Sequence, residues 1–224
     1  GKNDNGNNGR TELVFVVDRS GSMGGLESDA IGGFNSMLSK QRTIAGECRV
    51  TTLLFDHRIE TLHNHLDIRE VNDLTSRDYW VRGSTALLDA IGLAIDRMIV
   101  TQRHTAAAYR AQHVLFVIIT DGYENASRRY SLHQIKQMIT YERERYHWEF
   151  VFLGANIDAE QTAGDFGISP RCATDFHADG QGIKASFEAV ACAATAVRGG
   201  ADLDDLSAPD FLGGVRDDYR SRRR

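Results

Sequence analysis

The sequence predicts an α/β protein built on an open, doubly wound, mostly parallel sheet of six strands with helices on both faces. The apolar runs at residues 13–17 and 114–119 are continuous rather than alternating, as in strands that are buried on both faces. Segments with apolar residues at helical spacing separate these runs, which is typical of parallel strands joined by crossover helices. A chain of 224 residues, 42% hydrophobic and 25% charged, suits one such domain with a large core.

The expected elements follow one another between residues 11 and 200, which we assign to a single domain. Residues 1–10 are rich in Gly and Asn and are expected to be disordered. Residues 201–224 are acidic and then basic and are expected to form a flexible tail. The expected strands cover residues 13–17, 50–55, 58–66, 114–119, 149–153 and 171–176. The expected helices cover residues 28–41, about 85–99, 131–141, 158 to 164 or 167, and 182–198.

The second and third strands are expected to form a hairpin. Asp56 and His57 are the turn, and so short a link requires antiparallel strands, which makes the third strand an edge strand. Alternation along that strand predicts that His63 and His65 point to one face. We interpret them as part of a solvated edge rather than a zinc site, because no third ligand is evident.

Composition excludes several classes of protein. The net charge of −5 argues against a nucleic-acid binder that depends on bulk electrostatics. No apolar run approaches the roughly 20 residues of a membrane-spanning helix, and no signal peptide is visible, although the chain starts at Gly1 rather than Met. The three cysteines are widely spaced and odd in number, so we expect free thiols and a cytoplasmic protein.

Carboxylates and hydroxyls gather where the buried strands end. Asp18, Ser20 and Ser22 directly follow the first strand, and Asp121 follows the strand at 114–119. If these two strands are neighbours, both carboxylates face one crevice, and Thr85 before the long helix adds a hydroxyl. Such an all-oxygen set suits Mg²⁺ with some waters retained. The alternative is that Asp18 and Ser20 only cap the next helix.

Three motifs resemble one known family. The sequence Asp18-Arg19-Ser20-Gly21-Ser22 matches the D-x-S-x-S motif of von Willebrand factor type A (VWA) domains, and the sequences 83–87 and 119–122 resemble that family's threonine and aspartate loops. Together they resemble the metal-ion-dependent adhesion site (MIDAS), and the Arg after the first Asp resembles bacterial intracellular members. The resemblance implies a Rossmann-like VWA fold with one antiparallel edge strand. It also implies that the hydroxyls of Ser20, Ser22 and Thr85 contact a divalent cation, whereas Asp18 and Asp121 act largely through water.

We therefore predict a non-enzymatic, metal-dependent protein-binding (adaptor) module. The resemblance implies Mg²⁺, with Mn²⁺ or Ca²⁺ as alternatives, and a partner protein whose Asp or Glu completes the coordination shell. By family analogy the partner is an AAA+ ATPase or a component of a stress-response system, and no membrane partner is expected. One alternative is a magnesium-dependent phosphoryl-transfer enzyme, although the chain has no G-x-x-x-x-G-K-[ST] loop. The other is an RNA-binding adaptor, which the acidic balance opposes.

Other residues carry open alternatives. Tyr123, Glu124 and Asn125 either line the rim of the site or cap the next helix. Asn156 also lies at the end of a strand, and Asp158 is expected to cap a short helix. Core packing is the first interpretation of Trp80, with a partner interface as the second.

Overall fold

The computed structural model describes residues 9–222, so most of the segment expected to be disordered, residues 1–10, lies outside the described residues. Six strands form one sheet, as predicted. Their bounds are β1 Thr11–Asp18, β2 Cys48–Phe55, β3 Ile59–Asp67, β4 His113–Thr120, β5 Glu149–Gly154 and β6 Ala173–Asp175. The helices are α1 Glu27–Arg42, α2 Leu87–His104, α3 Leu132–Tyr146, α4 Ala159–Asp165, α5 Gly180–Arg198 and α6 Gly213–Ser221. Short 3₁₀ turns occur at Gly21–Met23, Ala107–Tyr109 and Pro170–Cys172.

The strand order is β3-β2-β1-β4-β5-β6. β1 pairs in parallel with both β2 and β4, so the two strands that end in the predicted aspartates are neighbours. β2 and β3 pair antiparallel, which confirms the predicted edge hairpin. The chain continues outward from β1 in one direction to β2 and in the other to β4. This reversal opens a crevice at the carboxyl ends of these strands.

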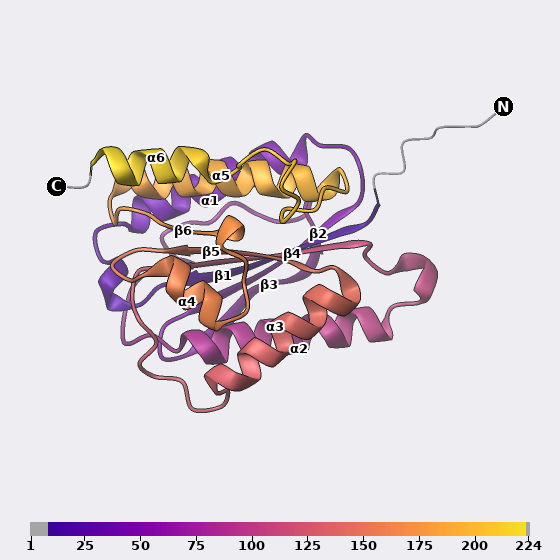
Figure 1. Cartoon of the computed structure of the whole chain (residues 1–224), viewed down its shortest axis with the longest axis horizontal. Coiled ribbons are helices and arrows are strands. Elements are labelled where there is room, and N and C mark those ends of the chain that lie inside the picture. The colour runs from indigo at the N-terminus through magenta and orange to yellow at the C-terminus, as the bar shows by residue number, and fades with distance from the viewer. Residues whose placement is uncertain (1–8, 223–224) are drawn as a thin grey trace.

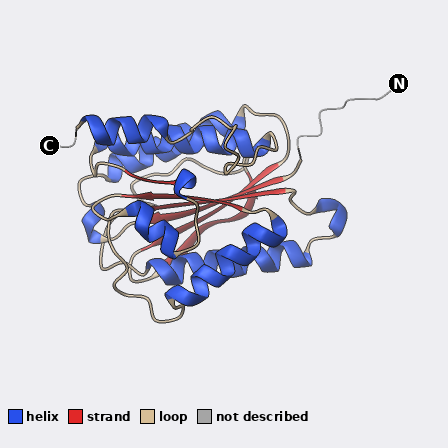
Figure 2. Cartoon of the chain, viewed as in Figure 1, coloured by secondary structure: helices blue, strands red, loops and turns tan. Residues whose placement is uncertain are grey.

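Two layers of helices enclose the sheet (Figures 1 and 2). α1, α5 and α6 cover one face, and α2 and α3 cover the other (Figure 1). Every residue of β1 is buried, which explains why its sequence shows no apolar–polar alternation. Phe34 of α1 contacts Phe15 and Phe187 edge-to-face, at centroid distances of 5.2 and 6.2 Å. Gly33 allows this close approach, because a Cβ there would lie 2.4 Å from the Phe187 ring.

The caps of two helices lie where the sequence predicts them. Ser131 accepts a hydrogen bond from the Gln134 N–H, and the Gln134 side chain accepts one from the Ser131 N–H, which completes a capping box at α3. Asp158 caps α4 by accepting from the Gln161 N–H at 2.9 Å. These caps fix where the two helices begin.

The prediction for His63 and His65 is wrong. A β-bulge interrupts β3 here, and His65 takes a positive φ of 54°, so the strand does not alternate simply. His63 stacks on Phe34 of α1, whereas the Nδ1 of His65 lies 2.5 Å from a carboxylate oxygen of Glu12. Since Phe15 also packs on Phe34, alternation along β1 places Glu12 on the other face. The two imidazoles therefore lie on opposite faces of the sheet.

Residues 201–222 also differ from the expectation of a flexible tail. α6 packs against α5 and β6, and Leu203, Leu212 and Val215 are buried. Arg222 pairs with Asp179 at the start of α5 (2.5 Å) and with Asp218. The acidic partners of this arginine are either distant in sequence or one helical turn away. The order of charges in the sequence alone therefore does not indicate these ion pairs.

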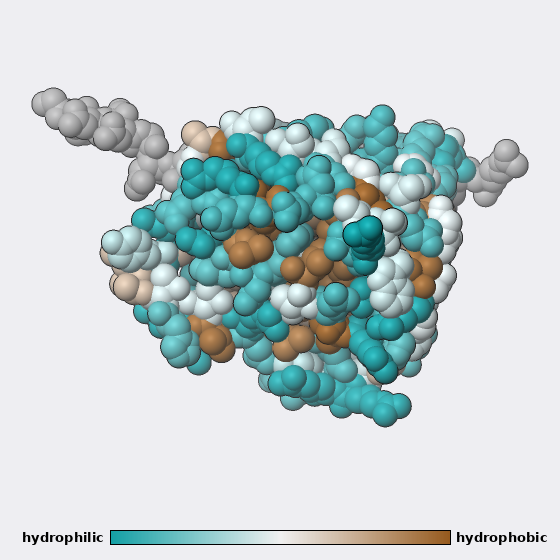
Figure 3. All heavy atoms as spheres, turned by 180° about the vertical axis from the view of Figure 1, so that it is seen from behind, coloured by the Kyte–Doolittle hydropathy of each residue, from teal (hydrophilic) through white to brown (hydrophobic). Residues whose placement is uncertain are grey.

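Within residues 9–222, no helix has the length and apolar character needed to cross a membrane. All three cysteines are free thiols, with Cys48 and Cys172 buried and Cys192 exposed. On the face opposite that of Figure 1, hydrophobic residues appear in small groups separated by hydrophilic ones (Figure 3).

Candidate metal centre

The pairing of β1 with β4 brings Asp18 and Asp121 together. One carboxylate oxygen of Asp18, Oδ2, accepts hydrogen bonds from the Thr120 hydroxyl at 2.7 Å and from the Asp121 N–H at 3.4 Å. Both aspartates are almost fully buried. Residues about 100 positions apart in sequence thus lie in direct contact at the carboxyl ends of two neighbouring strands.

The loop after β1 supplies two hydroxyls beside these carboxylates. The Ser20 N–H donates to the second oxygen of Asp18, Oδ1, at 2.6 Å, which forms a tight turn directly after β1. The Ser20 and Ser22 hydroxyl oxygens are 3.0 Å apart, and the Ser22 hydroxyl donates to Asp121 Oδ1. α1 begins only at Glu27, and Leu26 holds its N-cap position. The alternative in which Asp18 and Ser20 cap that helix is therefore not what the structure shows.

The loop before α2 brings Thr85 to the same place. The Gly21 N–H donates to the Gly83 carbonyl at 3.0 Å, which joins this loop to the loop after β1. A Cβ built on Gly122 would lie 3.7 Å from the Ser22 hydroxyl oxygen and 3.8 Å from that of Thr85. Both hydroxyls therefore flank Gly122. The structure brings all five predicted side chains together: Asp18, Ser20, Ser22, Thr85 and Asp121.

The electrostatics of the site disfavour two ionised carboxylates. Burial raises the pKa of Asp18 above its ordinary value. Burial also raises the pKa of Asp121 to about 6, and the nearby charge of Asp18 adds to this effect. Among residues 9–222, no Lys, Arg or His forms an ion pair with either aspartate. Arg19, although adjacent to Asp18 in sequence, turns away and pairs with Asp56 and Glu60.

One oxygen in the site has no protein partner. Asp121 Oδ2 is buried and makes no hydrogen bond within the described part of the chain, whereas both oxygens of Asp18 are occupied. A buried carboxylate oxygen without a partner is costly, and a hard cation would satisfy it. The donor set, with two carboxylates and three hydroxyls, contains only oxygen and fits Mg²⁺ or a similar cation. In the same residues, no cluster of three or more His, Cys, Asp or Glu is placed to hold a metal.

Sequence reasoning left the role of the residues after Asp121 open, and the structure resolves it. Asn125 accepts a hydrogen bond from the Thr85 N–H at 2.8 Å, and its own N–H donates to the Thr85 carbonyl at 3.0 Å. Glu124 accepts from the Leu88 N–H at 2.9 Å and so caps the preceding helix, α2, rather than the following one. These two residues hold Thr85 in place. In the sequence, this role is indicated by the position of both residues directly after the aspartate loop. Only the fold shows which helix they reach.

The rim of the site carries two exposed aromatic residues. Trp80 is 40% exposed, and the guanidinium groups of Arg19 and Arg82 lie over its ring, at 4.9 and 4.5 Å from the ring centroid. The first interpretation of Trp80, core packing, is therefore wrong. Tyr123 is exposed as well, and its hydroxyl accepts from the Asp158 N–H at 3.2 Å.

Comparison with solved structures identifies the fold. Proximal thread matrix protein 1 from the mussel byssus, with a zinc-occupied MIDAS motif, superposes with a TM-score of 0.59 at 15% identity, covering 83% of this chain and 46% of the mussel chain. The manganese-loaded TRAP protein of Plasmodium vivax superposes with a TM-score of 0.53 at 15% identity, covering 80% of this chain and 72% of the other. The chain thus spans less than half of the mussel protein. No family model matches the sequence, and no curated protein matches it.

These structural neighbours define the class of fold. The sheet order, the single antiparallel edge pair and the two helical layers are those of a VWA domain. The chain therefore has a Rossmann-like VWA fold, as the three sequence motifs predicted.

Proposed function

We propose that this chain is a divalent-metal-dependent protein-binding module, and that it is not an enzyme. The observation that carries the proposal is the buried Oδ2 of Asp121, which has no hydrogen-bond partner among residues 9–222, in a carboxylate that lies beside the hydroxyls of Ser20, Ser22 and Thr85. Mg²⁺ is the cation we expect, with Mn²⁺ and Ca²⁺ as alternatives, because hard oxygen ligands are the common feature of the site.

The residues of the site have different roles in this proposal. Asp18 fixes the loops, because its oxygens bind the Ser20 N–H and the Thr120 hydroxyl. The neutral hydroxyls and Asp121 would hold the cation. A cation bound mainly by neutral groups supplies positive charge that attracts an Asp or Glu carboxylate of a partner protein. The firmly bonded Thr85 loop keeps that position preorganised.

The surroundings of Asp18 support binding rather than phosphoryl transfer. Both oxygens of Asp18 accept hydrogen bonds from the protein, so this carboxylate is held in place by the surrounding loops. Within residues 9–222, lysine occurs only on α1, α3 and α5, so none lies on the three loops of the site.

Affinity capture from the native cell tests this proposal. We expect a partner protein to be retained in Mg²⁺, lost in EDTA and lost with Thr85→Ala. Thr43→Ala, which changes a threonine at the distant end of α1, is the matched control and should retain the partner. Capture that survives both EDTA and Thr85→Ala would contradict the proposal. Phosphatase turnover by the purified protein, abolished by Asp18→Asn, would also contradict it.

A further inference from the structure

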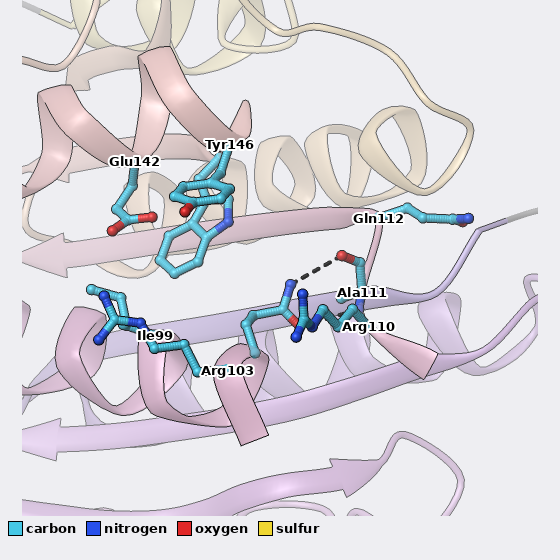
Figure 4. A pocket seen from close by; sticks show the side chains of 9 residues that line it. Ile99, Arg103, Arg110, Ala111, Gln112, Glu142 and Tyr146 are labelled. Atoms are coloured by element: carbon cyan, nitrogen blue, oxygen red, sulfur yellow. Dashed lines mark hydrogen bonds between the residues drawn. The ribbon is translucent and has the colours of Figure 1, made fainter. Parts of the chain in front are cut away.

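A second polar cavity lies between α2 and α3, away from the metal centre. Its volume is about 280 Å³, and its walls come from α2, α3, the segment before β4 and the start of β5 (Figure 4). Ile99 and Arg103 belong to α2, Glu142 and Tyr146 to α3, and Trp148 precedes β5. The cavity lies toward the amino ends of β4 and β5, whereas the metal centre lies at the carboxyl ends of the parallel strands.

Glu142 is the unexpected residue in this cavity. α3 buries Ile135, Ile139 and Glu142 on one face, so a carboxylate takes a position where an apolar residue would complete the stripe. The residue is only 4% exposed, and no hydrogen bond or ion pair reaches its carboxylate from the described residues. Figure 4 shows the carboxylate directed into the space between the two helices. Burial raises the pKa of Glu142, and the charge of Arg103 only partly opposes this.

The other walls of the cavity present aromatic rings and positively charged side chains. Trp148 is 5% exposed and stacks on Phe116 at 5.5 Å, so its ring is fixed, and the exposed Tyr146 stands beside it. Arg103 and Arg110 place positive charge at the cavity. Arg110 is held by a bond from its Nε to the Thr105 carbonyl at 2.9 Å.

The floor of the cavity is rigid. The Gln102 side chain donates to the Ala111 carbonyl at 3.0 Å and accepts from the Ala111 N–H at 3.1 Å (Figure 4). These two bonds use one N–H donor and the carbonyl oxygen of the Gln102 side chain, so they fix the orientation of that amide. Glu142, Arg103 and Arg110 are the charged side chains at this cavity.

We propose that this cavity binds a small amphoteric molecule whose N–H donors pair with Glu142, whose flat body lies against Trp148, and whose anionic group meets Arg103 and Arg110. A simple cation fits less well, because the two arginines would repel it. A simple anion would leave the buried carboxylate unpaired. Mononucleotides and aromatic amino acids both have the required arrangement, and the experiment separates them.

Tryptophan fluorescence gives a direct measurement. The chain has two tryptophans, so Trp80→Phe leaves Trp148 as the only reporter. Guanosine 5′-monophosphate and L-phenylalanine are titrated in EDTA, with guanosine and phenethylamine as probes that lack the anionic group. We expect one of the two anionic probes to change the Trp148 emission with a Kd below about 1 mM and to give the same Kd by calorimetry on the parent protein.

Variants test the assigned contacts. Glu142→Gln should weaken binding at least about tenfold, the size expected for a lost charge-assisted hydrogen bond. Glu144→Gln, an exposed glutamate on the same helix, is the matched control and should leave binding unchanged. Arg103→Gln should weaken the binding of the anionic probe and leave the binding of its anion-free analogue unchanged. The proposal is overturned if neither probe binds below about 1 mM, or if Glu142→Gln binds as tightly as the parent.

Discussion

The two ends of the sheet both hold buried or half-buried carboxylates, but they arrange them differently. At the carboxyl end, Asp18 and Asp121 converge and three hydroxyls join them. At the amino end, Glu12, Glu142 and Glu149 are separate, and each meets its own neighbour: His65, the charge of Arg103, and the Leu203 N–H. The converging carboxylates at the carboxyl end form a site for a cation. The separate carboxylates at the amino end each interact with a neighbour of their own. At the carboxyl end the Gly21 N–H donates to the Gly83 carbonyl, so the loop after β1 and the loop before α2 bring their side chains to one place.

The largest expected effect concerns the cation. Mg²⁺ at about 100 times its dissociation constant should stabilise the protein by about 2.7 kcal/mol, because it binds only the folded chain. Asp121→Ala should remove this stabilisation. Glu142→Gln at the other end should keep it. Thermal melting with Mg²⁺, Mn²⁺ and EDTA measures the effect. A parent melting curve that none of the three changes would contradict the metal centre.

The second prediction separates the two aspartates in the absence of metal. Asp18→Ala should destabilise the protein by about 1–3 kcal/mol, because it leaves the buried Ser20 N–H without its acceptor. Asp121→Ala should cost less, since it removes an unpartnered oxygen and relieves the repulsion with Asp18. Urea unfolding in EDTA gives both values. Equal losses would show that the two carboxylates play the same structural part.

The smallest expected effect is a pH dependence at the amino end. Burial raises the pKa of Glu149 to about 7, and the charges of Asp202 and Asp204 contribute. A carboxyl whose pKa is higher in the folded than in the unfolded chain binds more protons when folded, so its contribution to stability falls as pH rises from about 4.5 to 7. The side chain that replaces the glutamate in Glu149→Gln has no group that titrates in this pH range.

The stability of Glu149→Gln relative to the parent should therefore increase over this pH range, by an amount on the order of 1 kcal/mol given the partial exposure of the side chain. Melting temperatures measured between pH 4.5 and 8 test this. Glu144→Gln, at an exposed position, should show no such trend. A constant difference between Glu149→Gln and the parent would contradict the prediction.

The sequence predicts the features that depend on local pattern and strand order. Continuous apolar runs identify the buried strands, and the position of Asp18, Thr85 and Asp121 at element ends indicates the convergent site. The bulge that separates His63 from His65 has no local signal, because it depends on pairing with β2. Likewise Asn125 bonds a residue 40 positions away, and Glu142 looks like an ordinary exposed glutamate until α2 covers it. Tertiary contacts decide these cases.

The pairing of β1 with β4 has a consequence for the timing of folding. The hydrogen bond from Thr120 to Asp18 spans 102 positions, so the metal centre cannot exist in a chain that has paired only β1, β2 and β3. Such distant pairings form slowly because a long loop must close first. A cation that needs both β1 and β4 stabilises the native state more than the transition state for folding, unless the two strands already pair in that transition state. It therefore slows unfolding more than it speeds folding. The proposed capacity to capture a partner would then require the completed centre of the sheet, and a partly folded chain would not have it.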